Sequence, residues 1–213
     1  MLDVTERAFC NAHITIPRRS KMPPKPKYTK EEITAAALAV VSRGGMDALT
    51  AKELGRELST SASPIFTVFN SMQEVQDAVK LAAMQRFESY AHEPCDGMPL
   101  FKHVGMQMIR FAKEEPQLYR LIFMSQNSGA RSFSDIYSHL GPLADDCLAA
   151  LCREYELSPS AARMLFEHTW IFTFGIGALC AGGVCDLSSD EISAMLTRDF
   201  SAMLAITKKE DLH

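Results

Sequence analysis

The stretch 49–69, LTAKELGRELSTSASPIFTVF, restricts the fold of this chain more than any other part of the sequence. Two leucines lie four residues apart in its first half, and Ile65, Phe66 and Phe69 recur at three- and four-residue spacing in its second half. Both spacings follow one face of a helix. A proline falls in the first turn of the second pattern, where its missing N–H costs little. The sequence therefore predicts two short helices separated by a tight Ser/Thr-rich break.

The rest of the chain also shows helical patterns, without the alternation of apolar and polar residues that marks strands. A first helix begins at a capping box of Thr29 and Glu32 and stops at Gly44–Gly45. Further helices are predicted at 71–91, 99–115, 117–124, 135–157, 159–181 and 190–206. The pair Gly141–Pro142 predicts a kink in the helix 135–157. We therefore predict an all-α chain.

The charge of the chain is unevenly distributed, although its composition is that of a soluble globular protein with 47% hydrophobic and 23% charged residues. Residues 1–70 carry ten Lys or Arg and seven Asp or Glu, whereas the remainder carries twelve Lys or Arg and nineteen Asp or Glu; the whole chain has a net charge of −4. A basic front on an acidic body fits a chain whose first third meets phosphates. The arm 1–28 is basic and rich in proline, so we expect no regular structure there. Met22 leaves open that residues 1–21 are an upstream extension.

The six cysteines do not form a metal-binding pattern, because none belongs to a CxxC pair. Cys147 and Cys152 are five residues apart, as are Cys180 and Cys185, and on a helix this spacing turns the side chains away from each other. We interpret them as reduced cysteines of a cytosolic protein, with thiol sensing as the alternative. The sequence has no GxSxG, no HExxH and no phosphate-binding glycine loop. We therefore predict neither an enzyme nor a bound cofactor or metal.

One apolar stretch, 168–185, is a candidate for a membrane span. It is short for a span, and it contains His168 and several glycines. We therefore predict a buried, tightly packed helix and no contact with a membrane.

Two short helices joined by a tight break and packed on a longer first helix are typical of a helix-turn-helix. In such a unit the second helix lies in the DNA major groove, and its first residues face base edges. Ser61, Ala62 and Ser63 are small enough for the backbone to approach DNA, and serine hydroxyls can bond bases or phosphates. The alternative is a plain pair of antiparallel helices in an all-α protein, which agrees equally well with the spacing.

The order of motifs from Thr29 to about Val79 resembles the DNA-binding domain of TetR-type transcriptional regulators. A capped first helix ending in RGG is followed by MDALT, AKELGREL, SASPIFTVF and NSMQEVQDAV. The later stretches IRFAKEEPQLYRLIFM and HTWIFTFGIGAL are similar to parts of that family's ligand-binding and dimerisation region. The resemblance implies a three-helix DNA-binding domain at 29–72, preceded by the flexible basic arm at 1–28. A larger helical domain for ligand binding and dimerisation would occupy 73–213.

By this resemblance, Thr50 and Lys52 meet the DNA backbone, and the segment 61–67 belongs to the recognition helix. Since the usual phosphate contacts are partly missing, as described next, arm residues are expected to contribute as well. The predicted DNA-binding residues are Lys25, Lys27, Lys30, Thr50, Lys52, Ser61, Ala62, Ser63, Ile65, Phe66 and Thr67.

The chain departs from the family pattern at four positions. Phe66 stands where a tyrosine hydroxyl usually reaches phosphate, and Met72 stands where a lysine is common. Val68 replaces a frequent histidine. Ser59 occupies the place of a usual turn glycine, which predicts a positive φ for a residue that rarely adopts one.

The resemblance also implies a small-molecule site in the body and a dimer interface made by the last two helices. The predicted ligand-binding residues are Met108, Phe111, Tyr119, Phe123, His168, Trp170 and Phe174. Apolar residues at helical spacing are more often core, so simple interior packing is the alternative. The predicted dimer-interface residues are Gly175, Gly177, Ala178, Gly182, Met195 and Phe200. Close packing of helices within one chain is the alternative for this second group.

Together these features predict a cytoplasmic homodimer that acts as a transcriptional repressor. An unknown small-molecule effector would release it from a palindromic operator in double-stranded DNA. The alternative is an all-α ligand-binding or interaction protein with weak or lost operator binding, which the departures at Phe66 and Met72 favour.

Overall fold

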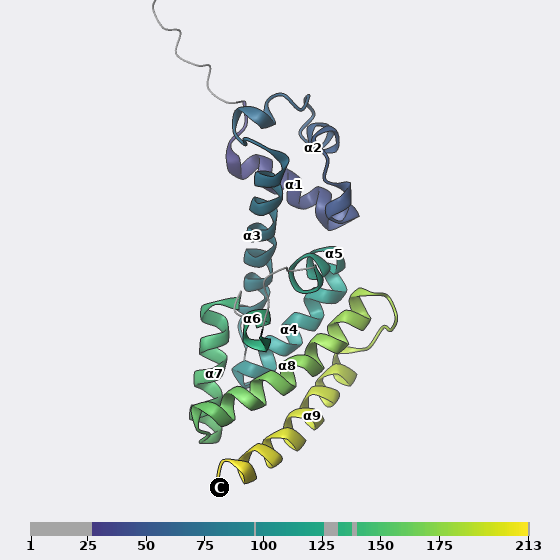
Figure 1. Ribbon diagram of the computed structural model, residues 1–213. Helices are drawn as coiled ribbons and strands as arrows, with labels where there is room; N and C mark the ends of the chain where they lie inside the picture. Colours follow the sequence, from purple (N-terminus) through teal and green to yellow (C-terminus); the bar gives the residue numbers. More distant parts are fainter. Residues whose placement is uncertain (1–26, 96, 126–131, 138–139, 213) are drawn as a thin grey trace, which may run out of the picture.

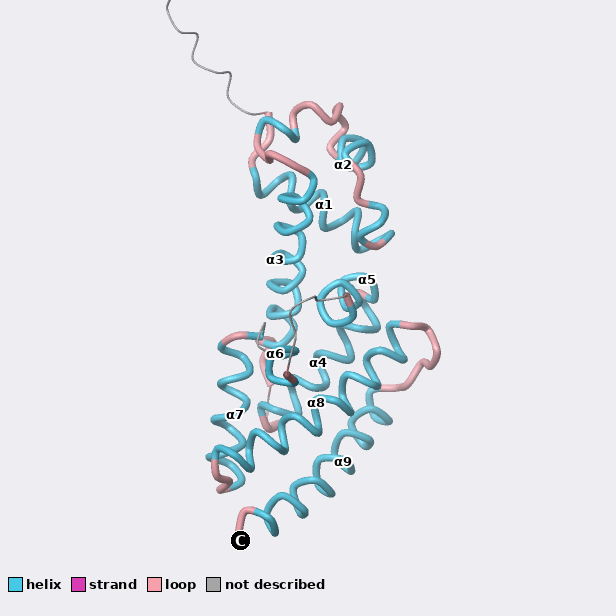
Figure 2. The backbone as a smooth tube through the Cα atoms, viewed as in Figure 1, coloured by secondary structure: helices cyan, strands magenta, loops and turns pink. Residues whose placement is uncertain are grey.

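The computed structural model describes residues 27–95, 97–125, 132–137 and 140–212. Within these ranges every regular element is helical, which confirms the predicted fold class (Figure 2). The helices form a small head and a larger body, and the long helix α3 joins the two (Figure 1). The predictions for residues 1–26 lie outside the described part of the chain.

The head contains α1 (Lys30–Gly44), the turn η1 (Met46–Ala48), α2 (Ala51–Glu57) and the turn η2 (Ile65–Thr67). The predicted capping box opens α1, because Thr29 Oγ1 accepts a hydrogen bond from the Glu32 N–H while the Glu32 carboxylate accepts one from the Thr29 N–H. The helix stops at Gly45, whose φ of 74° glycine adopts without strain. The buried face of α1 packs against α2 and α3.

The predicted third helix is not a regular α-helix. Between α2 and α3 only the three residues of η2 are helical, as a single 3₁₀ turn. No side chain caps its N-terminus, and Pro64 has no N–H with which to continue a ladder of hydrogen bonds. So short a segment gains too few hydrogen bonds to form a stable helix. It is held in place instead by Ile65 and Phe69, which are buried in the core of the head.

Helix α3 (Met72–Ala91) runs from the head into the body (Figure 1). It begins at Ser71, whose side chain accepts a hydrogen bond from the Glu74 N–H. One face is buried along the whole length of the helix through Val75, Val79, Ala83 and Phe87. The predicted domain boundary at 72–73 therefore falls in the first turn of a helix that head and body share, and the division into two domains stays a prediction.

The body is a bundle around one long central helix. Its elements are α4 (Leu100–Glu114), α5 (Pro116–Tyr119), the π-helical turn η3 (Arg120–Met124), α6 (Phe133–Tyr137), α7 (Pro142–Tyr155), α8 (Pro159–Ala181) and α9 (Ser189–Glu210). Helix α8 makes its most extensive contacts with α4 and α9. It is long and apolar enough to cross a membrane, but 50% of its most apolar window is buried inside the protein. Such burial is what a core helix shows, in agreement with the predicted packed helix.

The end of α4 connects the body to the head. Glu115, between α4 and α5, is 13% exposed and accepts hydrogen bonds from two other elements. Ser42 Oγ of α1 donates to its carboxylate at 2.7 Å, and an Arg86 guanidinium N–H of α3 donates at 2.9 Å. A shift of α4 along its axis would therefore act directly on the position of α1.

Two local predictions differ from the structure. Gly141 and Pro142 do not kink a helix but begin one, since Gly141 has a φ of 52° and Pro142 is the first residue of α7. Cys180 and Cys185 are not turned apart, because α8 ends at Ala181 and the chain folds back. Burial and then the neighbouring Cys185 raise the pKa of Cys180, so the two side chains lie near each other.

Candidate DNA-binding and ligand-binding sites

The turn after α2 is fastened by the residues that precede α1. Ser59 has a φ of 50°, which confirms the positive value expected where a glycine is usual. Tyr28 Oη donates to the Leu58 carbonyl at 2.7 Å, and Lys27 Nζ donates to Thr60 Oγ1 at 3.5 Å. The beginning of the described chain therefore lies against the turn of the helix-turn-helix.

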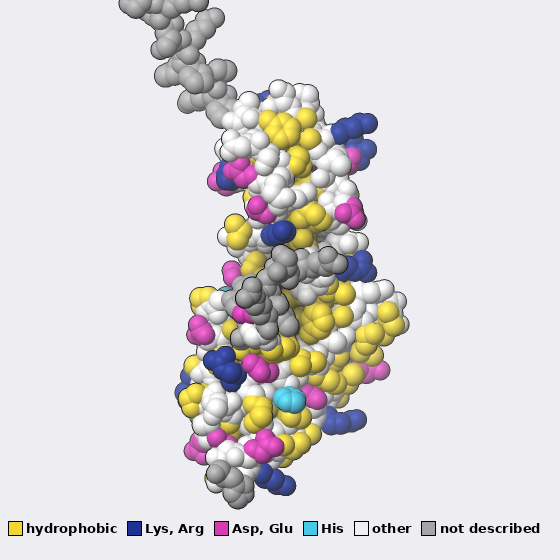
Figure 3. All heavy atoms as spheres, in the orientation of Figure 1, with side chains coloured by type: hydrophobic (Ala, Val, Ile, Leu, Met, Phe, Trp, Pro, Cys, Tyr) yellow, Lys and Arg dark blue, Asp and Glu magenta, His cyan; other side chains and the backbone are white. Residues whose placement is uncertain are grey.

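Beyond this turn the head presents a small polar surface with one aromatic ring. Ser61 and Ser63 are exposed, and Phe66 is 45% exposed. Apolar atoms are visible on the upper face of the head in Figure 3. The hydroxyl of exposed Thr67 donates to the Pro64 carbonyl at 2.6 Å, so its proton is already used within the chain. Ser61, Ser63 and Phe66 are thus the side chains best placed to touch a partner.

Two predicted DNA contacts belong partly or wholly to the interior of the head. Ile65 is fully buried and is part of the core, so it positions the segment and does not reach outward. Ala62 is half-buried, and its carbonyl accepts the Ile65 N–H at 3.1 Å. Ile65 is therefore removed from the candidate contacts.

The two lysines predicted to contact phosphate on α1 and α2 differ in whether a carboxylate of the same chain already pairs with them. Lys30 Nζ lies 3.1 Å from the Glu74 carboxylate and 5.0 Å from the centre of the Phe69 ring. Hydrogen bonds, first from the Asn70 N–H and then from Lys30, lower the pKa of Glu74, so this partner is ionised at neutral pH. Lys52 is exposed in the first turn of α2.

Thr50 is the N-cap of α2. Its hydroxyl oxygen accepts the Glu53 N–H at 3.1 Å, as the sequence predicts for a capping residue. The cap leaves the hydroxyl proton of Thr50 available at the exposed start of the helix. Lys25 lies outside the described residues.

The folded head carries no net charge. Residues 27–70 contain five Lys or Arg and five Asp or Glu, whereas residues 1–26 contain five Lys or Arg and two Asp or Glu. Within the head, Arg43 pairs with Glu57 and Arg56 pairs with Glu53. The positive excess of the first third of the chain therefore lies in residues 1–26 of the arm.

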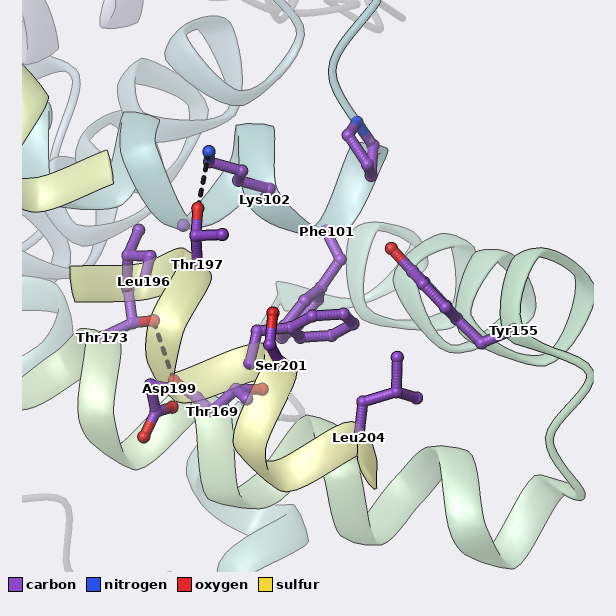
Figure 4. A pocket seen from close by; sticks show the side chains of 13 residues that line it. Phe101, Lys102, Tyr155, Thr169, Thr173, Leu196, Thr197, Asp199, Ser201 and Leu204 are labelled. Atoms are coloured by element: carbon purple, nitrogen blue, oxygen red, sulfur yellow. Dashed lines mark hydrogen bonds between the residues drawn. The ribbon is translucent and has the colours of Figure 1, made fainter. Parts of the chain in front are cut away.

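A cavity of about 270 Å³ opens between α4, α8 and α9 in the body (Figure 4). Its lining residues are Pro99, Phe101, Lys102, Gly105, Tyr155, Thr169, Thr173, Leu196, Thr197, Asp199, Phe200, Ser201 and Leu204. Its volume is close to the lower limit for small-molecule pockets, which start at about 300 Å³. The wall is mainly apolar and aromatic, with one basic and one acidic side chain.

None of the seven predicted ligand-binding residues lines this cavity. Met108, Phe111 and Tyr119 are fully buried in an aromatic core, where the Tyr119 and Phe123 ring centres are 4.9 Å apart. Burial raises the pKa of the Tyr119 hydroxyl well above its usual range, as expected in a closely packed interior. Phe174 stacks on Tyr119 at 6.4 Å. These residues are packing, which was the alternative interpretation of the sequence.

The two remaining predicted ligand-binding residues, Trp170 and His168, also lie outside the cavity. Met108 and Trp170 border a second cavity of only about 10 Å³, which is too small for anything beyond a water molecule. His168 is exposed on α8 and does not occupy the centre of the body. The sequence signal that marked the true cavity was weaker: a glycine at 105 on the inner face of α4 and threonines 169 and 173 facing it from α8.

The outward faces of α8 and α9 carry exposed apolar side chains. On α8, Ile171 is 55% and Leu179 46% exposed, and a Cβ at Gly175 would meet nothing within 4 Å. On α9, Met195 and Ile206 are exposed in the same way. Figure 3 shows hydrophobic atoms gathered on the body over these two helices. We call Ile171, Gly175, Leu179, Met195 and Ile206 the α8/α9 face.

Two of the predicted dimer-interface residues, Gly177 and Phe200, face the interior of their own chain. A Cβ at Gly177 would collide with the Tyr119 hydroxyl of the same chain, so its missing side chain serves packing within the subunit. Phe200 is turned into the cavity, where its ring lies 5.1 Å from that of Tyr155. Ala178 is half-buried and Gly182 is exposed at the end of α8, so both remain candidates.

The sequence matches no protein-family model, and a comparison with curated proteins finds no significant relative. Solved structures do match. A TetR-family transcriptional regulator from Vibrio parahaemolyticus is 17% identical with a TM-score of 0.61, covering 81% of this chain and 97% of its own. A TetR-family regulator from Mesorhizobium loti is 19% identical with a TM-score of 0.52, covering 83% and 95%.

A third match is a TetR variant from Acinetobacter baumannii in complex with minocycline. It is 16% identical with a TM-score of 0.54, and the alignment covers 87% of this chain and 99% of that one. All three similarities extend over both the head and the body, because they cover more than four fifths of the chain. At these identities it is the arrangement of helices that is shared. The chain has the fold of the TetR-family transcriptional regulators.

Proposed function

We propose that this protein is a DNA-binding transcriptional regulator, a cytoplasmic homodimeric repressor that leaves a palindromic operator when a small molecule binds its body. The observation that carries the proposal is the head. It combines a capped first helix, a short second helix and a tight turn with exposed small residues, at one end of a chain with the TetR fold. No catalytic role is part of the proposal.

Readout of bases is assigned to Ser61 and Ser63, with Phe66 beside them. Serine hydroxyls can donate to or accept from base edges, and a phenyl ring can contact a thymine methyl group. Phosphate binding is assigned to Lys27 and Lys52 on the head and to the arm, including Lys25. Because the folded head is electrically neutral, we expect the arm to supply most of the salt-dependent affinity.

The partner across the operator dyad is a second copy of the chain. A two-fold dimer places two heads one helical turn of DNA apart, or a multiple of it, which is why such proteins recognise palindromes. The α8/α9 face supports this assignment, since contiguous exposed apolar side chains are costly to leave in water.

The effector site is assigned to the cavity between α4, α8 and α9. One solved neighbour holds minocycline, which shows that a related fold can take a small molecule. The cavity lies at the start of α4, and the end of α4 carries Glu115 with its bond to Ser42 of the head. A ligand that prefers one position of α4 would shift the population of head arrangements away from the DNA-binding one.

The alternative is an all-α ligand-binding or interaction protein that does not bind an operator. Met72 packs against the head core where a phosphate-binding lysine is common, and Phe66 has no hydroxyl. The neutral head also favours this alternative.

Selection from randomised DNA distinguishes the operator-binding regulator from the interaction protein. Gel-shift titrations of the selected sequence and of the chain's own upstream DNA then measure the affinity. We expect the wild type to select a palindromic sequence, and we expect the Ser63→Ala variant to select different bases within it. A Ser132→Ala variant in the body serves as the matched control and should select the wild-type sequence. Failure to enrich any sequence would contradict the regulator and leave the interaction protein.

A further inference from the structure

The cavity between α4, α8 and α9 has an aromatic and aliphatic half. The Phe200 ring lies 5.1 Å from the Tyr155 ring and 5.9 Å from the Phe101 ring. Leu196 and Leu204 of α9 complete this half of the wall. In Figure 4 Phe101, Tyr155 and Leu204 border an open space beside α9. The half is suited to an apolar group of modest size.

The α8 side of the cavity offers no hydroxyl proton. Thr169 Oγ1 donates to the Leu165 carbonyl at 2.7 Å, and Thr173 Oγ1 donates to the Thr169 carbonyl at 2.8 Å. Both hydroxyl groups therefore already donate to a carbonyl of their own helix. A ligand therefore meets methyl groups and weak acceptors on this side, and its polar group must be satisfied elsewhere.

Lys102 provides the strongest polar group of the wall. Its Nζ donates to Thr197 Oγ1 at 2.9 Å, while the Thr197 hydroxyl donates to the Ser193 carbonyl at 2.7 Å. Thr197 is thus a neutral acceptor, and only one of the three ammonium protons is used. Among the residues that the structure describes, no carboxylate forms an ion pair with Lys102. Its charge is uncompensated at the edge of an apolar space.

Asp199, the other charged residue of the wall, is a weaker attractor for a ligand. In Figure 4 Lys102 lies beside Thr197, whereas Asp199 lies lower in the view, near Thr169. Burial raises the pKa of Asp199, which disfavours its charged form, and nearby His168 acts against that rise. Lys102 is the basic side chain of the wall and is therefore the group assigned to an anionic ligand.

We propose that this cavity binds a small carboxylate with an aryl or acyl body, and that Lys102 holds the carboxylate. The carboxylate replaces the Thr197 hydroxyl as the principal partner of the ammonium, and the apolar body lies among Phe101, Tyr155 and Phe200. A carboxylate adds the attraction of opposite charges to the ammonium hydrogen bond, which the neutral Thr197 hydroxyl does not provide, so exchange of partners favours the bound state. The inference rests on the effector site of the proposed function and names the chemistry of that effector.

The test is calorimetric titration of the full chain, without DNA, against two matched sets of ligands. One set is phenylacetate, phenethyl alcohol and phenethylamine; the other is octanoate, octanol and octylamine. We expect one acid to bind roughly tenfold more tightly than its alcohol, with no preference for the amine. A larger preference in the phenyl set indicates an aryl body, and a larger preference in the octyl set indicates an acyl body.

Two variants and one control decide the role of the cavity. Lys102→Met keeps the apolar stem and should reduce the preference for acid over alcohol to about one. Lys80→Met removes an exposed lysine of α3 outside the cavity and should leave the preference unchanged. Gly105→Ala fills the α4 side of the cavity and should weaken all ligands of the preferred set alike. Melting curves of each variant establish that it is folded.

Three results would overturn the proposal: equal binding of acid and alcohol by the wild type, an acid preference that survives Lys102→Met, or no binding of either set. Because no DNA is present, these outcomes are independent of operator binding. Absence of operator binding alone would contradict the proposed regulator and leave the carboxylate site standing.

Discussion

At the scale of single residues, three glycines of the body differ in how much space surrounds the position of a Cβ atom. A Cβ at Gly105 would lie 3.6 Å from a Leu196 methyl, which is ordinary van der Waals contact at the edge of the cavity. At Gly175 it would meet nothing within 4 Å. At Gly177 it would collide with Tyr119, a fully buried side chain whose hydroxyl donates to the Phe174 carbonyl at 3.2 Å.

These surroundings predict opposite effects of the same substitution. Gly105→Ala should raise the free energy of unfolding by about 0.5–1 kcal/mol, since alanine restricts the unfolded chain and fits the helix. Gly177→Ala should lower it by about 1–3 kcal/mol through overpacking. Gly175→Ala adds a Cβ on the α8/α9 face, so its effect also includes the predicted dimer contact, and Gly105→Ala is the matched control for Gly177→Ala. Urea unfolding measures these two variants, and a stable Gly177→Ala would show that Tyr119 moves easily.

Phe66 permits a test at the proposed DNA surface. If a missing phosphate contact limits affinity, Phe66→Tyr should tighten operator binding by about 1 kcal/mol, the net value of one hydrogen bond. The residue is exposed, so the added hydroxyl costs no burial. Phe133→Tyr adds the same hydroxyl in α6 and should have no effect. Titration of selected DNA measures the change; an unchanged affinity would mean that the Phe66 ring does not approach a phosphate.

At the scale of elements, the sequence predicted well whatever depends on local chemistry. The capping box at Thr29 and the stop at Gly45 are present, because each requires only residues within one turn. The third helix was predicted wrongly, since spacing alone cannot distinguish a short helix from a turn held by two buried side chains. The proximity of Cys180 and Cys185 was missed because the spacing argument assumed a continuous helix, whereas α8 ends at Ala181.

The cavity could not be predicted from periodicity. Its wall combines residues of α4, α7, α8 and α9, and their approach depends on how four helices pack. Met108 and Trp170, which show the strongest apolar pattern, close-pack and leave almost no space. Lys102 and Asp199 carried no helical signal beyond that of ordinary surface residues. The helices of the body were thus predictable, whereas the gap between them was not.

Helix α4 is the element that connects the cavity to the head, and Glu115 is its point of contact. Glu115→Gln loses the ion pair with Arg86 and weakens the bond to Ser42. We expect unchanged affinity for the effector, since Glu115 is outside the cavity, but a coupling between effector and DNA that is smaller by about 0.5–2 kcal/mol. The measurement is DNA titration with and without saturating effector.

Glu114→Gln is the matched control for this prediction. Its carboxylate bonds to Tyr90 and Arg110 within the body and makes no contact with α1. The control should keep the wild-type coupling. Equal loss of coupling in both variants would mean that the effect arises from general loosening of α4 and not from the contact with the head.

At the scale of the whole molecule, the α8/α9 face predicts how two copies associate. Ile171→Asp places a charge on this face and should weaken the dimer by about 2 kcal/mol or more, the range of interface hot spots. Leu81→Asp changes an exposed apolar residue on α3, away from this face, and should leave association unchanged. Sedimentation equilibrium distinguishes the cases. A wild-type chain that is monomeric at micromolar concentration would contradict the predicted dimer.

The central claim is that the head and its basic arm bind a specific DNA site. The most direct measurement is the affinity of the full chain and of a variant lacking residues 1–26 for a selected palindromic site, over a series of salt concentrations. We predict that the full chain loses affinity steeply as salt rises, with a slope of about −0.9 for each phosphate neutralised. Since the arm holds five Lys or Arg against two acids, its removal should flatten the slope while sequence preference remains. Affinity indistinguishable from that for unrelated DNA at every salt concentration would contradict the account.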